Sequence, residues 1–397
     1  MKILVISLFG SYSENSNNSR ITNIVSAFRD CEVQVATSNF DHGGKTIKHH
    51  QPRIVGNVEI AYLPVPPYKS NLSIARLYSH FLFAIRLKKW LKGLNYKPDL
   101  VYCAMPSSSA AYVAGQYCKH NNIPFVIDVI DLWPDSLIPI MPMRKLIKTL
   151  VAPWKWITNC AYKSADYISA ESRSYMQKVH RVSSHVPASY TYIGVDMSMC
   201  RKLIQSSQVK VNKPDDEIWL CYGGSLGNSY GFDVVLEAIR YIHTKGVKYK
   251  MWFVGDGEKH REIEQFSEEY GLSVEITGRL PYGDLLKYLS VCDIAFNSFN
   301  ESTLVVHSYK FNDYVATNCY VMNNLKGETS EIVENYGIGC NYNKGNLNSR
   351  LLGVCLKWGD LKSSLQGKME KLIREKLDKD IIYACLIDDI KDKLNLR

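Results

Sequence analysis

The chain has 397 residues, of which 46% are apolar and 22% charged, as in an ordinary soluble protein with room for two or three domains. The net charge is +9, but no nucleic-acid-binding motif accompanies it, and no apolar run approaches the roughly 18 residues that span a membrane. We therefore expect neither nucleic-acid binding nor an integral membrane protein. Eleven cysteines without a C-x-x-C pair predict reduced thiols and a reducing compartment.

The N-terminal half alternates short apolar strands with helices. Strands are predicted at Lys2–Ser7, Glu32–Thr37, Val58–Pro64, Leu100–Ala104, Pro124–Val129 and Tyr167–Ala170. Helices are predicted at Arg20–Phe28, Ile74–Lys92 and Ser109–His120. Short apolar strands separated by helices indicate a parallel sheet that is covered on both faces.

The C-terminal half shows the same alternation of strands and helices. It follows a polar stretch, residues 198–216, which we interpret as an interdomain linker. The expected strands are Ile218–Tyr222, Lys250–Val254, Val274–Thr277, Ile294–Asn297 and Cys319–Met322. The expected helices are Phe232–His243, His260–Tyr270, Tyr282–Val291, Tyr309–Ala316 and Glu328–Tyr336. Two doubly wound domains predict ligand binding at the carboxyl ends of the strands.

Two sets of residues in the C-terminal half fit an anionic ligand. The first is the turn Gly223–Gly231, whose glycines let the backbone approach a phosphate, although many such turns are Gly-rich. The second is Lys310 with Asp313, which share one face in the first turn of a helix, where the macrodipole favours an anion. Taken alone, these two residues favour an intrahelical ion pair. Arg279, at a strand end, fits either a phosphate contact or an ordinary surface turn.

Carboxylates also follow a strand in the N-terminal half, in the segment Asp128–Asp135. At that position a carboxylate can bind or deprotonate a hydroxyl, and Asp131 is the first candidate, while Asp128 is the weaker one. Capping of the following turn by Asp131 or Asp135 is the alternative. The long polar loop after the first strand, Phe9–Arg20, is either a mobile loop or a ligand-binding one.

Basic and bulky apolar residues are mixed at helical spacing in two segments, residues 81–92 and 143–156. Both lie in the N-terminal half and both contain Trp. They predict docking on an anionic membrane surface, and the alternative is a pair of amphipathic helices with solvated basic faces.

As an ordered set these motifs resemble glycosyltransferase family 4, and in particular its branch of bacterial surface-polysaccharide transferases. The family pattern K-x-x-E-Y-x-A-x-G is matched by Lys310, Asp313, Tyr314 and Ala316, with Asp for Glu and Asn318 in place of the usual Gly. A D-L-W-P segment like Asp131–Pro134 occurs in the same branch. The resemblance covers most of residues 217–340.

The resemblance implies the GT-B fold, an α/β architecture of two Rossmann-like doubly wound parallel-sheet domains that face each other across a cleft. Residues 1–200 would form the acceptor domain, onto which a helix at about 380–397 packs back, and residues 215–379 would bind the nucleotide sugar. It further implies a retaining hexosyl- or acetamidohexosyltransferase that uses a UDP-sugar. The two basic segments that contain Trp suggest a lipid-linked saccharide as the acceptor, and hence a role in building lipopolysaccharide or capsule. The enzyme would need neither metal nor cofactor, and would work in the cytoplasm, peripherally on the inner membrane face.

The family also implies roles for individual residues. Asp131 and Lys310 would be catalytic, because Asp131 orients the acceptor hydroxyl and Lys310 neutralises the departing diphosphate. The donor would be bound by Gly224, Gly227, Arg279, Leu280, Ser308, Lys310 and Asp313. The acceptor would be bound by Gly10, Ser11, Asp131 and Trp133.

Three further positions depart from the family pattern. Val305 stands where many members have the first of two Glu residues, and Asn228 and Tyr230 stand where many have Arg and Lys in the Gly-rich turn. These departures keep a non-catalytic GT-B partner subunit open as an alternative. A nucleotide-sugar epimerase, which shares the fold, is the other alternative.

Overall fold

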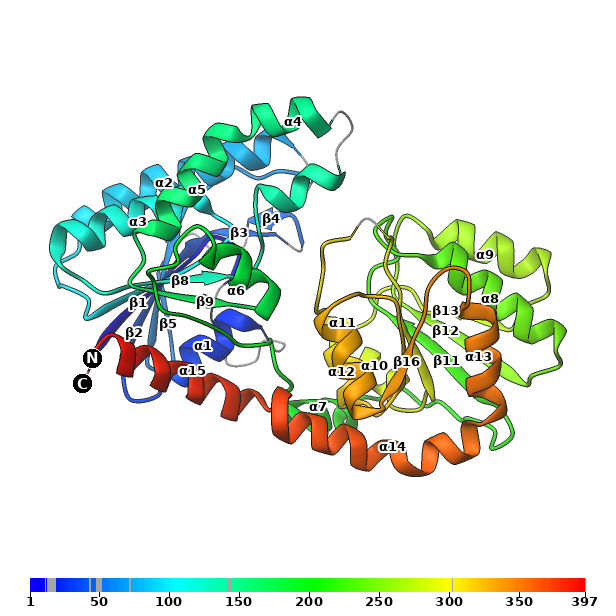
Figure 1. Cartoon of the computed structure of the whole chain (residues 1–397). Coiled ribbons are helices and arrows are strands. Elements are labelled where there is room, and N and C mark those ends of the chain that lie inside the picture. The colour runs from blue at the N-terminus through cyan, green and yellow to red at the C-terminus, as the bar shows by residue number, and fades with distance from the viewer. Residues whose placement is uncertain are drawn as a thin grey trace. The chain divides into compact units, whose positions relative to one another are not determined.

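The computed structural model describes the chain except residues 11, 13–18, 43, 48–51, 71–72, 141–143, 302 and 397. The chain divides into two compact units (Figure 1). Unit 1 consists of Met1–Ile193 together with Lys379–Arg397, and unit 2 consists of Gly194–Asp378. Each unit is a parallel sheet with helices packed against it.

The sheet of unit 1 has the strand order β10-β9-β8-β7-β1-β2-β6-β5. Its neighbours are parallel except for β5 and β6, which pair antiparallel. The strands are β1 (Lys2–Ser7), β2 (Glu32–Ser38), β5 (Arg53–Val55), β6 (Val58–Leu63), β7 (Leu100–Ala104), β8 (Phe125–Val129), β9 (Tyr167–Ala170) and β10 (Ala188–Tyr190). A separate antiparallel pair is formed by β3 (Phe40–Asp41) and β4 (Thr46–Ile47). The central strands are buried along their whole length, which explains their uninterrupted apolar sequences.

The helices of unit 1 begin at side-chain caps that the sequence provides. Ser19 accepts a hydrogen bond from the Thr22 N–H, and Ser73 from the Arg76 N–H, each at 3.2 Å. The helices are α1 (Arg20–Ala27), α2 (Ile74–Lys92), α3 (Ser108–Asn121), a 3-10 turn (Asp135–Ile140), α4 (Arg144–Leu150), α5 (Ala152–Lys163), α6 (Arg173–His180) and α15 (Lys379–Lys393). The last of these, α15, packs on α1 and contributes Tyr383, Leu386, Ile387 and Ile390 to the core.

The sheet of unit 2 is entirely parallel and has the order β13-β12-β11-β14-β15-β16. Its strands are β11 (Ile218–Gly223), β12 (Tyr249–Val254), β13 (Val274–Ile276), β14 (Ile294–Asn297), β15 (Tyr320–Asn323) and β16 (Gly339–Asn341). Its helices are α7 (Met197–Ser206), α8 (Phe232–Thr244), α9 (His260–Glu269), α10 (Tyr282–Leu289), α11 (Tyr309–Ala316), α12 (Glu328–Tyr336), α13 (Leu347–Leu356) and α14 (Trp358–Leu372), which is followed by a π-helical turn (Ile373–Leu377).

The interpretation of residues 198–216 as a linker is wrong for their first part. Met197–Ser206 form α7, which is capped by Asp196 through a 2.9 Å hydrogen bond from the Met199 N–H. This helix packs on α10 of the same unit. Since only Cys200 of α7 is fully buried, its sequence carries little apolar signal, and the helix is stabilised by contact with a distant element.

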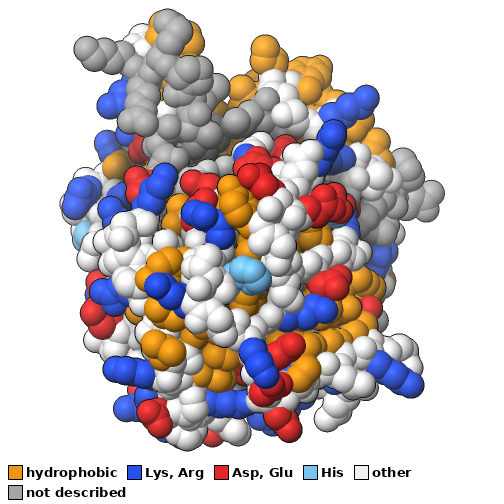
Figure 2. Space-filling model, turned by 90° about the vertical axis from the view of Figure 1, so that its right-hand side faces the viewer, with side chains coloured by type: hydrophobic (Ala, Val, Ile, Leu, Met, Phe, Trp, Pro, Cys, Tyr) orange, Lys and Arg blue, Asp and Glu red, His pale blue; other side chains and the backbone are white. Residues whose placement is uncertain are grey.

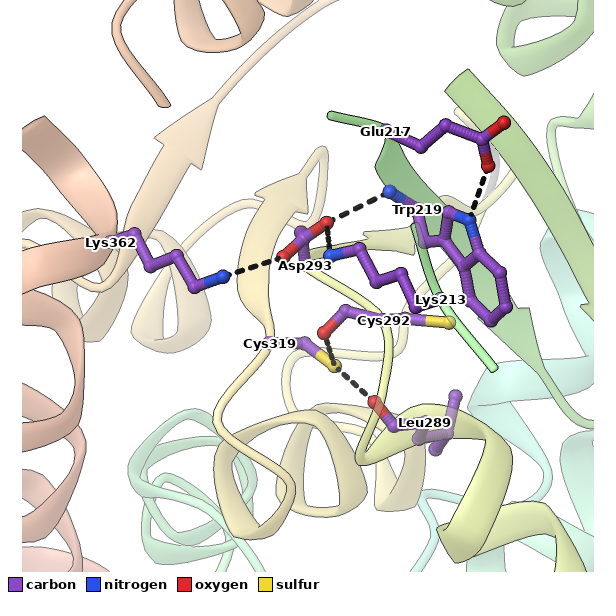
Figure 3. Close-up of polar contacts among 8 residues, drawn as sticks. All are labelled: Lys213, Glu217, Trp219, Leu289, Cys292, Asp293, Cys319 and Lys362. Carbon is purple, nitrogen blue, oxygen red and sulfur yellow. Dashed lines mark hydrogen bonds and ion pairs between the residues drawn. The ribbon is translucent and has the colours of Figure 1, made fainter. Parts of the chain in front are cut away.

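The amino ends of the unit 2 strands are tied together by the buried carboxylate of Asp293 (Figure 3). Asp293 accepts a 2.8 Å hydrogen bond from the Trp219 N–H, pairs with Lys213, and has Lys362 at 3.8 Å. Below it the Cys319 thiol donates to the Leu289 carbonyl at 3.2 Å. These contacts fix the amino ends of the strands. Ligands in doubly wound folds bind at the opposite, carboxyl ends of the strands.

The surface carries charge of both signs. Figure 2 shows one face of the molecule, on which acidic and basic side chains are interspersed rather than collected in a single block. Among the described residues, no helix has both the length and the apolar character that crossing a membrane requires.

Candidate functional site

The first turn of α11 in unit 2 is fixed by a chain of hydrogen bonds. The Ser308 hydroxyl accepts from the Phe311 N–H at 3.2 Å and donates to Asn297 Oδ1 at 2.8 Å, so the helix is held to the carboxyl end of β14. Asn297 in turn donates to Asn323 Oδ1 of β15 at 2.8 Å. The positive end of the α11 dipole is thus anchored at the edge of the sheet where nucleotides bind in doubly wound folds.

Lys310 lies in a cage of aromatic rings. Its Nζ donates to the Tyr230 hydroxyl at 2.8 Å and lies 4.1 Å from the centre of the Tyr230 ring. The Tyr222 ring is 5.4 Å away and the Phe299 ring 6.0 Å. The ammonium is therefore held by cation–π attraction and one neutral acceptor, and among the described residues it forms no ion pair. Lys310 is thus a positive charge at the head of a helix, with no carboxylate partner in the part of the chain that the structure describes.

The glycine-rich turns pack directly against this lysine. A Cβ on Gly224, where φ is +119°, would lie 2.8 Å from Lys310 Cε. A Cβ on Gly255, where φ is +157°, would lie 1.9 Å from the Gly224 carbonyl oxygen. The backbone of the β11–α8 turn therefore reaches Lys310 only because no side chain intervenes, as phosphate-binding turns require. Gly227 lies farther along the same turn, with the Tyr230 ring beyond it.

Asp313 does not pair with Lys310 in the structure. Its Oδ1 accepts a 2.7 Å hydrogen bond from the Tyr282 hydroxyl at the start of α10. Burial raises the pKa of Asp313 to about 7, against the lowering effects of the Tyr282 hydrogen bond and the Lys310 charge. Burial and the neighbouring Asp313 also raise the pKa of Tyr282, so that Tyr282 stays a donor. The intrahelical ion pair that the sequence left open is thus absent between these two residues, and Asp313 keeps acceptor capacity for a hydroxyl ligand.

The other predicted donor residues are less closely engaged. Arg279 is exposed and makes no ion pair with a described residue, and Leu280 is half-buried beside it. Asn228 hydrogen-bonds Glu258, and its carbonyl accepts from Asn300. The structure therefore brings Gly224, Ser308, Lys310 and Asp313 together and leaves Arg279 at the periphery.

In unit 1 a buried ion pair lies behind the predicted acceptor segment. Arg20 of α1 contacts Asp128 of β8 through Nε–Oδ2 and Nη2–Oδ1, both 2.7 Å, and both side chains are buried. Arg20 also donates to the Thr191 carbonyl at 2.5 Å and to the Ser169 hydroxyl at 3.0 Å. Asp128 is therefore fully occupied in holding α1 to the sheet and is not available to a ligand.

Asp131 begins the turn that follows β8. Its Oδ1 accepts from the Leu132 N–H at 2.7 Å, so the carboxylate caps its own turn. Burial raises the pKa of Asp131, against the lowering effects of hydrogen bonds and of the Arg76 charge. Asp135, the alternative cap, instead forms an exposed ion pair with Lys155 at 2.8 Å.

Trp133 forms the centre of an aromatic stack. The His80 ring lies parallel to it at 5.5 Å, Trp154 lies edge-on at 5.6 Å, and the Arg76 guanidinium carbon is 3.9 Å from its centre. The bond between Trp133 and Pro134 is cis. Burial and the charges of Arg76 and His42 lower the pKa of His80 to about 3, so this ring is neutral. Gly10 accepts a 3.0 Å hydrogen bond from Thr37 through its carbonyl, while Ser11 lies outside the described residues.

Sequence reasoning missed several members of these two sites. Tyr230 was noted only as a departure from a family pattern, and Tyr282 and Arg76 were not singled out, because their partners lie far away in sequence. Glu171, directly after β9, is buried with Oε2 lacking a hydrogen-bond partner among the described residues. No group of three His, Cys, Asp or Glu side chains within the described ranges is arranged to hold a metal ion.

The chain is similar to known proteins both in part of its sequence and in its fold. Residues 204–302 match the family model described as glycosyl transferases group 1. No curated protein matches the chain. Among solved structures, HepE from Anabaena in complex with UDP has a TM-score of 0.69 at 16% identity, covering 99% of this chain and 100% of that one.

Two further solved structures are similar over their whole length. WaaG, a glycosyltransferase involved in lipopolysaccharide biosynthesis, has a TM-score of 0.66 at 13% identity, covering 98% of this chain and 99% of that one. The α,α-trehalose-6-phosphate synthase of Burkholderia multivorans has a TM-score of 0.68 at 11% identity, covering 99% of each chain. The predicted fold class is thereby confirmed: the chain has the two-domain α/β GT-B fold, with a glycosyl transferases group 1 segment at residues 204–302.

Proposed function

We propose that the protein is a retaining glycosyltransferase of family 4 that moves a sugar from a UDP-sugar to a lipid-linked saccharide in surface-polysaccharide assembly. The observation that carries the proposal is Lys310, an ammonium without a carboxylate partner among the described residues, held against a side-chain-free backbone turn at the head of α11. The group 1 match supports a transferase. UDP as the nucleotide is supported by the HepE structures, which contain UDP and UDP-glucose.

Lys310 would act on the diphosphate. In the transition state negative charge builds up on the departing UDP, and a fixed ammonium beside helix N–H groups stabilises that charge more than it stabilises the intact donor. Asp313 would accept hydrogen bonds from the ribose hydroxyls. No enzyme nucleophile takes part in this scheme, since the donor phosphate removes the acceptor's proton.

Asp131 and Trp133 would bind the acceptor in unit 1. The carboxylate of Asp131 accepts a hydrogen bond from the attacking hydroxyl and orients its lone pair. The rings stacked around the buried Trp133 hold that turn rigid, so that Asp131 keeps a fixed position.

A lipid-linked acceptor and a peripheral position on the inner membrane face are supported by one surface of unit 1. Five apolar residues lie exposed on one face of α2, where helical periodicity brings them together: Ile74, Leu77, Tyr78, Phe81 and Ile85. Lys88, Lys89 and Lys92 are exposed in the following turns. Leu146, Leu150 and Trp156, on α4 and α5, are also exposed. Apolar residues beside lysines fit an anionic bilayer surface.

The donor site is tested by nucleotide binding. Thermal unfolding is measured with UDP, GDP and ADP for wild type, Asp313→Ala and Lys310→Ala, with exposed Glu334→Ala and Lys371→Ala as matched controls. Stabilisation by UDP alone, lost in the two site variants and kept in the controls, is the expected result. Equal or absent stabilisation by all three nucleotides contradicts a UDP-specific donor site.

The reaction class is tested by products. The protein is incubated with UDP-sugars and a membrane lipid extract, and both UDP and radiolabelled lipid are measured. Sugar in the lipid fraction supports transfer, an epimerised nucleotide sugar indicates the epimerase alternative, and nucleotide binding without any product indicates a non-catalytic partner subunit.

A further inference from the structure

A groove opens in unit 1 between the C-terminal parts of α2 and α3. The two helices pack against each other (Figure 1), and near the start of α3 the Ser109 hydroxyl donates to the His80 carbonyl of α2 at 3.3 Å. Toward their ends the helices leave a cavity of about 850 Å³, which residues 94–97 also border. We call this cavity the α2–α3 groove. Because the chain passes from α2 into β7 and from α3 into β8, the groove lies at the amino ends of these strands, away from the acceptor turn after β8.

The charged residues that line the groove are all basic. Lys88 and Lys92 of α2, Lys97 of the following loop and His120 of α3 border it, and no described residue of its lining is acidic. The C-terminal ends of α2 and α3 each contribute roughly half a negative charge through the helix dipole. The three exposed lysines outweigh these two helix ends, so the groove keeps a net positive charge and suits an anionic ligand.

The remaining walls of the groove are largely aromatic and apolar. They include five half-buried side chains: Tyr96, Tyr112, Tyr117, Leu94 and Val113. A small inorganic anion gains nothing from such walls, whereas a ligand that joins a phosphate to a hydrocarbon part can bury both in the same groove. The lining therefore favours an amphiphilic anion.

The exposed apolar face of α2 leads directly into this groove. Phe81, Ile85, Lys88 and Lys92 follow one another at spacings of four, three and four residues, so they share one face of the helix. Phe81 and Ile85 are exposed apolar residues, and the two lysines line the groove. Hydrocarbon contacts and phosphate contacts thus follow one another along a single helix, as in helices that lie in a bilayer interface.

We propose that the α2–α3 groove binds the head group of one anionic phospholipid. Its phosphate is held by Lys88, Lys92 and Lys97, and its glycerol and first acyl carbons lie against the tyrosines and apolar side chains of the walls. The inference rests on the proposed docking of α2 on a membrane, and it names the ligand of that surface. An acidic oligosaccharide is the other class of ligand that lysines and tyrosines can bind, but it leaves the exposed apolar face of α2 unexplained.

A lipid in the groove would also set the direction of α2 on the bilayer. The helix begins near the proposed acceptor site, where the Arg76 guanidinium carbon lies 3.9 Å from the centre of the Trp133 ring. Lys88 follows Arg76 by about 18 Å along the helix axis. A lipid fixed at this far end, together with the apolar residues between, would lay α2 along the membrane surface with the acceptor turn at its other end.

The test measures binding of soluble lipids to the full chain by isothermal titration, below the concentration at which they form micelles. Wild type should bind dihexanoyl-phosphatidylglycerol at least about tenfold more tightly than dihexanoyl-phosphatidylcholine or glycerol 3-phosphate. Equal binding of the choline lipid, equal binding of glycerol 3-phosphate, or tighter binding of an oligogalacturonate overturns the inference. The second of these outcomes indicates a site for a soluble phosphate, and the third a site for an acidic glycan.

Variants locate the binding. Lys88→Gln combined with Lys92→Gln should weaken binding of dihexanoyl-phosphatidylglycerol at least about tenfold. Lys371→Gln combined with Lys376→Gln, which makes the same change in charge at exposed residues of unit 2, should stay within about twofold of wild type. Unchanged binding in the groove variant, or an equal loss in both variants, overturns the inference.

Co-sedimentation with phosphatidylglycerol vesicles separates this inference from the proposed docking. Wild type that sediments with vesicles but does not bind the soluble lipid overturns the inference and leaves docking by α2 in place. Wild type that binds the soluble lipid through Lys88 and Lys92 but does not sediment with vesicles supports the groove and contradicts the docking.

Discussion

Lys310 donates its hydrogen bond to Tyr230, 80 residues earlier in the chain, at 2.8 Å. In the family pattern that the sequence resembles, many members have a cation at this position of the Gly-rich turn, whereas the neutral Tyr230 hydroxyl holds the lysine without adding charge.

Tyr230→Phe should therefore weaken UDP binding about tenfold, since one hydrogen bond to a charged group is worth about 1.5 kcal/mol. Uridine binding should not change, because uridine lacks the diphosphate that we propose Lys310 to contact. Isothermal titration with both ligands checks this. Equal weakening for uridine and UDP would mean that Tyr230 shapes the site as a whole rather than Lys310.

Asp313 should make nucleoside binding dependent on pH. Its pKa is raised to about 7, mainly by burial, so it takes up a proton as pH falls below 7 and can then accept fewer ribose hydrogen bonds. Uridine affinity should fall about tenfold between pH 8 and pH 6, on the assumption that only the carboxylate binds. Uridine is used because its phosphate-free structure does not titrate in this range. In Asp313→Asn the affinity should be weaker and flat with pH, and a wild-type profile that is equally flat would argue against the assignment.

Gly255 should tolerate no side chain. Its Cβ would lie 1.9 Å from the Gly224 carbonyl oxygen, so Gly255→Ala must push apart the two turns that meet below Lys310. We expect a loss of about 2–3 kcal/mol in the free energy of unfolding and loss of UDP binding. Gly353, inside α13, has nothing within 4 Å of its added Cβ, so Gly353→Ala should gain about 0.5–1 kcal/mol. Urea denaturation of both variants measures the contrast.

Asp128 should matter for stability rather than for ligand binding. Asp128→Asn leaves the buried Arg20 without its counter-ion, and breaking such a pair costs about 3–5 kcal/mol. The matched control is Asp135→Asn, which breaks an exposed pair with Lys155 and should cost at most about 1 kcal/mol. Denaturant unfolding of unit 1, followed by its tryptophans, compares the two. A similar loss of unfolding free energy in both variants would contradict the expectation that the buried ion pair contributes more to stability than the exposed one.

Membrane docking should depend on the exposed face of α2. The double variant Phe81→Glu, Ile85→Glu places two negative charges among apolar residues and should reduce co-sedimentation with vesicles of phosphatidylglycerol and phosphatidylcholine at least about tenfold. Leu356→Glu, at a still more exposed apolar residue on α13 of unit 2, should leave co-sedimentation unchanged. If Leu356→Glu reduces co-sedimentation as much as the double variant does, the loss reflects the change in net charge rather than damage to a docking face.

Element positions were predictable wherever local sequence decides them. The bounds of β1, α2 and α11 match the prediction because buried apolar runs, serine caps and polar turns are local signals. The helix α7 was missed because its partner α10 lies some 80 residues away and its own sequence is polar.

The site residues also divide into those that local sequence reveals and those that depend on distant partners. Lys310 and Asp313 stand out in the sequence because their spacing places them together on one short helix. Their actual partners, Tyr230 and Tyr282, come from other turns of the sheet, and their pairing depends on strand order. The raised pKa of Glu171 is less readable still, since it arises mainly from burial in the folded unit.

The return of α15 to unit 1 has a consequence for how the chain is made. Unit 2 is a continuous stretch of the chain, Gly194–Asp378, whereas unit 1 needs residues from both ends. Tyr383 lies against Arg20, and Asp389 accepts from Tyr167, so the last helix covers groups that are buried in the finished core. On a ribosome, where the chain emerges from its N-terminus, unit 2 can close as soon as it is out. Unit 1 is synthesised first but completes its core last, and until then the Arg20–Asp128 pair lacks the α15 side chains that cover it.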